Sequence, residues 1–223
     1  MATTIHEPPQ IEPRRLPDNS GGGGFGNLVP APGDLRAVQD IPLAPSQTGI
    51  WVALGAITMS FAALTSALIV RQGTGMDWQH IALPPMLFLN TLALVASSAT
   101  LEIARRRVAS YARGTERQMA AAMSWMVATL GLGILFVAGQ YVAWLRLKAA
   151  GIYLATNPNS SFFYLFTGVH AIHVLGGLAG LLYVMSKLSR SILRRSTFAA
   201  ATQYWHFMGL LWLYLLVLLW TKL

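Results

Sequence analysis

Apolar residues gather in five long stretches, and the charged residues lie mainly between and before them. The stretches cover about residues 48–70, 81–103, 119–146, 160–186 and 199–221. Each is close to the roughly 20 residues that a helix needs to cross about 30 Å of hydrocarbon. The pattern predicts an all-α integral membrane bundle of five transmembrane helices.

The first 46 residues differ from the rest of the chain. They hold most of the eleven prolines, a run of four glycines at 21–24, and charges of both signs. Such a segment buries too little apolar surface to offset the entropy lost on ordering. We therefore expect a flexible polar tail at 1–46 and a five-helix transmembrane domain at 47–223.

Positive charge lies mainly on one side of the predicted bundle. The tail and the segments after the second and fourth stretches hold 12 of the 16 Lys and Arg residues. The positive-inside rule then predicts an N-terminus inside the cell and a C-terminus outside. The net charge of +8 thus reflects topology rather than nucleic-acid binding. Expected contacts for anionic lipid headgroups are Arg105, Arg106, Arg194 and Arg195.

Composition excludes several kinds of redox chemistry. The chain is 54% hydrophobic with a mean hydropathy of +0.50, and it contains no cysteine. Thiolate metal sites, iron–sulfur clusters and disulfides are therefore excluded. Within the stretches, Glu102 lies beside three arginines and is expected to form an interfacial ion pair. A proton pump or ion-coupled transporter needs ionisable groups in its core, so neither is favoured.

Three histidines lie within the stretches, at His170, His173 and His206. His170 and His173 share a helix face, and the depths predicted for His173 and His206 nearly coincide. Two interpretations are open. The first is an autonomous b-type cytochrome, with haem or metal between His173 and His206. The second, which we favour, is hydrogen bonding to each other, to a backbone carbonyl or to a neighbouring subunit, because no intramembrane carboxylate completes a metal site.

Uncharged polar and small residues favour a tightly packed bundle. Asn90 and Gln140 can hydrogen-bond between helices, and the glycines from Gly176 to Gly180 permit close approach of helix backbones. Trp212 lies deep in the fifth stretch and is expected to pack in the core or contact another subunit.

The motifs along the chain fall in a recognisable order. They are Met59-Ser60-Phe61, Asn90-Thr91, Gly139-Gln140, His170-Ala171-Ile172-His173 before Gly176-Gly177, and Tyr204-Trp205-His206-Phe207 before Trp212. Over about residues 48–221 the chain resembles the cytochrome c oxidase subunit III family of the haem–copper oxidases. It is similar to the short five-helix bacterial form.

The resemblance implies an accessory subunit that is not catalytic alone. Such a subunit docks on haem-bearing subunit I, together with subunit II, in a complex of the bacterial cytoplasmic membrane that reduces oxygen to water and moves protons. It binds phospholipid, supports proton uptake and stabilises subunit I, within a larger respiratory supercomplex in some cases. Haem and copper are expected in the partner subunits and no cofactor in this chain. The implied motif and contact positions are Asn90, Gln140, His170, His173, Gly176, Gly177, Trp205, His206 and Trp212.

Two positions depart from the family pattern. Ile57 and Gly209 stand where the family often has carboxylates, so the resemblance does not extend to any role that needs those acids. An accessory subunit of a quinol oxidase or a nitric oxide reductase remains an alternative.

Overall fold

The computed structural model describes residues 45–74, 85–112, 119–155, 157–190 and 195–222. These residues form five helices: α1 (Pro45–Thr74), α2 (Met86–Ala112), α3 (Met119–Ala149), α4 (Pro158–Ser189) and α5 (Arg195–Lys222). All five are long and apolar enough to cross a membrane. The predicted all-α, five-helix bundle is thereby confirmed. Residues 1–44 of the predicted tail lie outside the described residues.

The helix ends differ from those of the apolar stretches that predicted them. The largest difference is in α2, which begins later than expected, at Met86 rather than 81, and continues to Ala112 rather than 103. Arginine is a good helix former, and Glu102 pairs with Arg105 and Arg106 one turn later, so the helix continues after the apolar run has ended. Pro85 immediately precedes the helix, and Pro84 lies outside the described residues.

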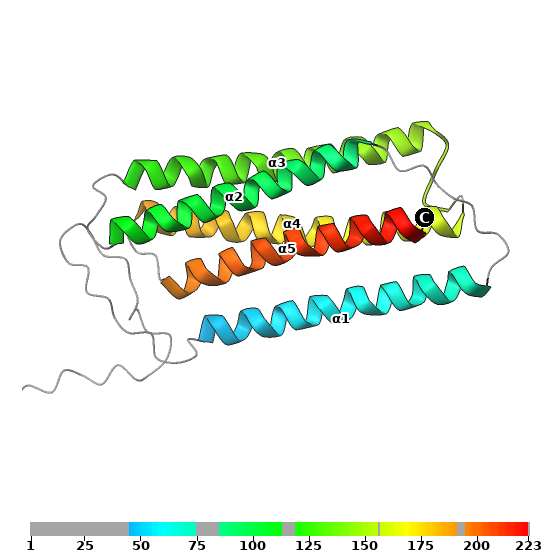
Figure 1. Cartoon of the computed structure of the whole chain (residues 1–223), viewed down its shortest axis with the longest axis horizontal. Coiled ribbons are helices and arrows are strands. Elements are labelled where there is room, and N and C mark those ends of the chain that lie inside the picture. The colour runs from blue at the N-terminus through cyan, green and yellow to red at the C-terminus, as the bar shows by residue number, and fades with distance from the viewer. Residues whose placement is uncertain (1–44, 75–84, 113–118, 156, 191–194, 223) are drawn as a thin grey trace, which may run out of the picture.

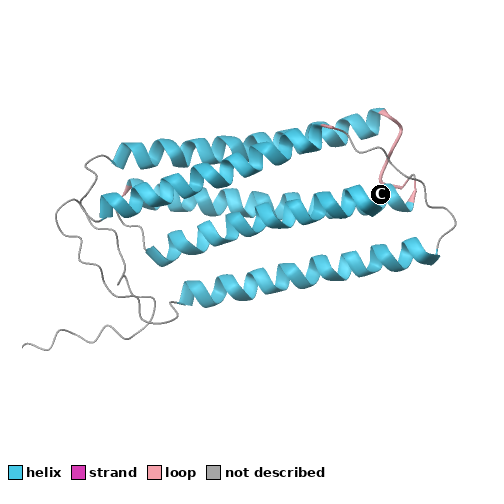
Figure 2. Ribbon diagram, in the orientation of Figure 1, coloured by secondary structure: helices cyan, strands magenta, loops and turns pink. Residues whose placement is uncertain are grey.

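Successive helices run in opposite directions (Figure 1). The helix α2 packs on α3 and α5, while α4 packs on α3 and α5. Figure 2 shows helices and connecting loops, without strands, in the described part of the chain. The four helices α2 to α5 therefore enclose a common interior.

The helix α1 lies at the edge of the bundle, with α5 between it and α2 (Figure 1). Phe61 stacks on Phe166 of α4, with 6.4 Å between ring centroids. The hydroxyl of Thr65 is 2.8 Å from that of Tyr214 on α5. These contacts fix α1 against α4 and α5.

The connection between α3 and α4 is short and hydrogen-bonded. Gly151 adopts φ +79°, and the next amide, of Ile152, donates to the carbonyl of Leu147 at 3.0 Å. Asn157 caps α4 by accepting from the amide of Ser160 at 2.7 Å, and Pro158 follows as the first helical residue. These hydrogen bonds define where α3 ends and where α4 begins.

The helices are longer than a bilayer core is thick. At 27–32 residues they measure about 40–48 Å, against about 30 Å of hydrocarbon. Both ends of the bundle can therefore reach the headgroup regions. At the end where α2 and α4 finish lie Arg105, Arg106, Arg107, Lys187, Arg190 and Arg195. At the other end lie Arg71, Arg146, Lys148 and Lys222.

Candidate functional site

Trp205 of α5 fills the centre of the enclosed interior. Its side chain is 0% exposed, and its indole N–H donates to Ser97 of α2 at 3.1 Å. A Cβ added to Gly133 of α3 would lie 2.8 Å from the ring, and one added to Gly177 of α4 would lie 3.1 Å from it. The two glycines thus make the space that the indole occupies, and Trp205 joins all four helices.

Trp212 lies two turns after Trp205 on α5, and its indole N–H also donates to a hydroxyl of α2. Its indole N–H donates to the hydroxyl of Thr91 on α2 at 2.9 Å. The ring stacks on His170, with 5.3 Å between centroids, and meets Phe136 of α3 edge-on at 5.0 Å. The structure therefore places Trp212 and His170 in the core, as the packing interpretation predicts for Trp212.

Asn90 and Gln140 also lie inside the bundle. Asn90 is 4% exposed and packs so closely on Gly139 that any Cβ at that position would overlap its side-chain amide. Gln140, the next residue on α3, is 2% exposed. Both residues lie inside the bundle, but Asn90 Nδ2 and both amide atoms of Gln140 have no hydrogen-bond partner within the described residues, so the expected hydrogen bonds between helices are not seen for these atoms.

The side chains of His173 and His206 contact different helices. His173 places Nδ1 2.8 Å from the carbonyl of Val169 and packs edge-on against Phe61 of α1. The backbone carbonyl of His173 accepts from the Tyr204 hydroxyl at 3.0 Å. Since Tyr204 is two residues before His206, His173 and His206 lie at similar depths in the bundle, as predicted. Tyr204 and His206 are, however, about 200° apart around α5. The structure does not favour a haem held between His173 and His206.

The two adjacent glycines of α4 differ in environment. Gly177 is buried against Trp205 and Tyr204, whereas a Cβ on Gly176 would meet one atom, the Tyr204 hydroxyl, at 3.7 Å. A Cβ on Gly180 would meet nothing within 4 Å. Close helix approach thus depends on Gly177 rather than on the whole small-residue stretch.

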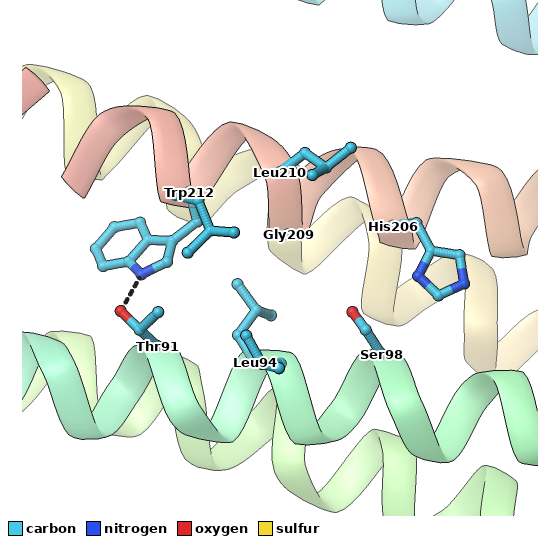
Figure 3. Close-up of a pocket in the computed structure, with 9 residues that line it drawn as sticks. Thr91, Leu94, Ser98, His206, Gly209, Leu210 and Trp212 are labelled. Atoms are coloured by element: carbon cyan, nitrogen blue, oxygen red, sulfur yellow. Dashed lines mark hydrogen bonds between the residues drawn. The ribbon is translucent and has the colours of Figure 1, made fainter. Parts of the chain in front are cut away.

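An apolar groove of about 260 Å³ runs between α2 and α5 (Figure 3). Ser98 and His206 lie toward one end of it, and the hydrogen-bonded pair of Thr91 and Trp212 lies at the other. It is lined by Thr91, Leu94, Val95, Ser98, His206, Gly209, Leu210, Trp212 and Leu213. The half-buried His206 thus faces this groove rather than the bundle centre.

Charged groups lie near the His206 end of the groove. Arg105 donates twice to Glu102, each time at 2.7 Å, and Arg106 donates once at 2.9 Å. The predicted ion pair of Glu102 is confirmed, and Glu102 lies one turn after Ser98 on α2, beyond the end of the groove where His206 lies. Arg195 is exposed at the start of α5, and Arg194 lies outside the described residues.

The two positions at which the family often has carboxylates, Ile57 and Gly209, differ in their surroundings. Ile57 is 8% exposed and belongs to the apolar core. Gly209 lies in the groove, where an added Cβ would be 3.4 Å from the Ser98 hydroxyl. The residues described contain no group of three or more His, Cys, Asp or Glu side chains that could hold a metal ion.

Some core contacts have no obvious signal in the sequence. The roles of Gly133 and Gly139 depend on side chains from other helices, and Thr129 accepts from Ser97 through its backbone carbonyl at 3.1 Å. The one usable signal is the seven-residue spacing of Trp205 and Trp212, which places both indoles on one face of α5.

Comparison with known proteins gives a consistent set of matches. A family model described as cytochrome c oxidase subunit III matches residues 52–222. A probable cytochrome c oxidase subunit 3 of Mycobacterium leprae is 33% identical over 180 residues, covering 74% of this chain and 81% of that protein. The cytochrome c oxidase subunit 3 of Corynebacterium diphtheriae is 28% identical, covering 76% and 84%. That of Synechocystis is 29% identical, covering 76% and 72%.

Proposed function

This chain belongs to the cytochrome c oxidase subunit III family, and we propose that it docks on the haem-bearing subunit I of a terminal oxidase, together with subunit II. It is a multi-pass membrane protein and an accessory subunit of a haem–copper oxidase. The observation that carries the assignment is the family match over residues 52–222, which reaches all five helices.

On this proposal the chain acts through contact rather than through redox chemistry of its own. Haem and copper belong to the partner subunits. This chain stabilises subunit I and supports proton uptake while oxygen is reduced to water. Its rigid core, in which Trp205 joins four helices, suits a supporting role. The relatives are named cytochrome c oxidase subunits, so a quinol oxidase or nitric oxide reductase is not favoured.

The proposed location is the bacterial cytoplasmic membrane, with the N-terminus inside. Bacterial relatives support the location. The unequal distribution of positive charge between the two ends of the bundle supports the orientation. We propose a tail at 1–46 and a helical domain at 47–223; a family match that begins at residue 52 supports this division, although α1 already begins at Pro45.

The proposed lipid site is the groove between α2 and α5 (Figure 3). Its apolar lining suits an acyl chain. The arginines near its His206 end, Arg105 and Arg106, suit an anionic headgroup, with Arg194 and Arg195 as further contacts. A phospholipid held there would cover the surface that α2 and α5 leave open.

Filling the groove should remove a bound lipid. Gly209→Leu places a branched side chain among the lining residues, so we expect native mass spectrometry of the complex to show one retained phospholipid fewer. Gly55→Leu on α1 is the matched control, because nothing lies within 4 Å of a Cβ at that position. An unchanged lipid count in Gly209→Leu would contradict the lipid site.

Loss of the side-chain contacts of His173 and His206 should make the oxidase lose activity sooner during turnover. His173→Ala removes the packing on Phe61 of α1, and His206→Ala removes the polar group from the groove. We expect lower assembly or faster loss of activity during sustained turnover, with the initial rate of oxygen reduction much less affected. Oxygen consumption followed over many turnovers measures both rates.

The control is Leu175→Ala, an exposed position on α4 that should leave assembly and turnover unchanged. Immediate and complete loss of haem chemistry in a fully assembled His173→Ala or His206→Ala complex would contradict an accessory role.

A further inference from the structure

Three polar side chains from three different helices lie in the bundle interior with hydrogen-bonding atoms that remain unpaired. They are Asn90 of α2, Gln140 of α3 and His170 of α4, and none is more than 4% exposed. Within the described part of the chain, no partner accepts from or donates to Asn90 Nδ2, either polar atom of the Gln140 amide, or either ring nitrogen of His170. Buried polar atoms in native proteins almost always have partners.

The contacts around these three side chains place them at one level of the bundle. Asn90 touches Gly139, the residue before Gln140. The indole N–H of Trp144 donates to the Thr167 hydroxyl at 3.0 Å, which fixes α3 against α4. From this bond, one turn along each helix leads to Gln140 on α3 and His170 on α4.

A second set of contacts connects His170 to α2 through α5. His170 stacks on Trp212, and the Trp212 indole N–H donates to Thr91, the residue after Asn90. Asn90, Gln140 and His170 are therefore linked through shared neighbours: Gly139 on α3, and Phe136 and Trp212, which both contact His170.

The unpaired atoms select the chemistry of the ligand. The amide nitrogens of Asn90 and Gln140 are donors, the Gln140 oxygen is an acceptor, and a neutral imidazole supplies one donor and one acceptor. A cation would need acceptors alone, and an anion would need donors alone. Water accepts two hydrogen bonds and donates two, so one molecule can serve donors and acceptors together, and it pairs four of the five unpaired atoms.

We propose that Asn90, Gln140 and His170 form a binding site for an ordered water molecule inside the bundle. The water accepts from the two amide nitrogens and donates to the Gln140 oxygen and to the unprotonated nitrogen of His170. It thereby links α2, α3 and α4 at a depth where lipid offers no hydrogen bonds. The inference does not depend on which oxidase the chain serves.

Hydroxyl-radical footprinting of the full chain in its purified complex tests this site. Radicals formed by an X-ray pulse from a bound water modify the side chains next to that water, even where bulk solvent does not reach. Phe136, which meets His170 edge-on, should be modified several times faster than Phe166. The comparison is matched because Phe136 is 1% exposed and Phe166 is 0% exposed, and Phe166 packs against Phe61 and Phe162 instead.

Two variants test whether the polar atoms hold the water. Gln140→Leu and His170→Phe keep most of the side-chain volume, remove the hydrogen-bonding atoms and introduce no thioether that would consume radicals, so the modification of Phe136 should fall to the rate of Phe166. Equal protection of Phe136 and Phe166 in the unmodified protein would overturn the proposal. So would fast modification of Phe136 that persists in both variants. The comparison of the two phenylalanines in the unmodified protein stands even if a variant fails to fold.

Discussion

Replacing Trp205 by alanine is expected to lower the free energy of unfolding by about 3–5 kcal/mol, the usual cost of removing a large aromatic side chain from a packed core. The indole is 0% exposed and lies against Gly133 and Gly177, two residues that have no side chain with which to fill the cavity. The substitution also leaves the Ser97 hydroxyl without its indole partner. The measurement is an unfolding titration of the full chain in bicelles, in which limited proteolysis reports the fraction of unfolded chain.

Trp220 provides the matched control on the same helix. It is 64% exposed, so Trp220→Ala should change the free energy of unfolding by less than about 1 kcal/mol. Trp205→Phe keeps a ring in the cavity but loses the hydrogen bond to Ser97, and its effect should lie between the other two. Equal effects of Trp205→Ala and Trp220→Ala would show that Trp205 does not hold the four helices together.

Gly139→Ala should destabilise the bundle by about 1–3 kcal/mol, a typical cost of overpacking, although alanine is the better helix former. The added methyl group would overlap the side-chain amide of Asn90, which is buried and cannot swing into solvent. The helices α2 and α3 must then separate locally. The same unfolding titration measures the change.

A second substitution separates this clash from other causes. In an Asn90→Ala background the overlap is absent, so Gly139→Ala should cost much less there than in the unmodified chain. Gly131→Ala on the same helix is the control, because nothing lies within 4 Å of a Cβ at that position. A cost of Gly139→Ala that does not depend on Asn90 would contradict the packing described.

The five helices could be predicted from the sequence because a run of about 20 apolar residues is a local property of the chain. Their ends could not. The α2 helix continues through Arg105, Arg106 and Arg107, where hydropathy indicates a loop but helix propensity and pairing with Glu102 maintain the helix.

The orientation of each helix about its axis was much harder to predict. A membrane helix is apolar on every side, so the pattern of hydrophobic residues does not show which face turns inward. This is why the sequence suggested that His173 and His206 could meet, although the structure turns them toward α1 and α2. It is also why Gly176 and Gly177, adjacent in the sequence, could not be told apart before their neighbours were known.

Polar residues gave the more dependable guide to the interior. Asn90 and Gln140 were expected to hydrogen-bond between helices; both are buried, although their amide nitrogens have no partner among the described residues. Gly139 entered the sequence analysis only as part of the Gly139-Gln140 motif, and its packing role could not be predicted because it comes from a side chain on another helix, Asn90.

Gentle solubilisation of native membranes, followed by affinity purification through this chain, tests most directly whether it is an accessory subunit. We expect a haem-bearing subunit I and a subunit II to purify with it, and the haem spectrum to disappear from the sample when stronger detergent removes these partners. A chain that purifies alone from mild detergent, or that keeps haem within its own five helices after the partners have gone, would contradict this role.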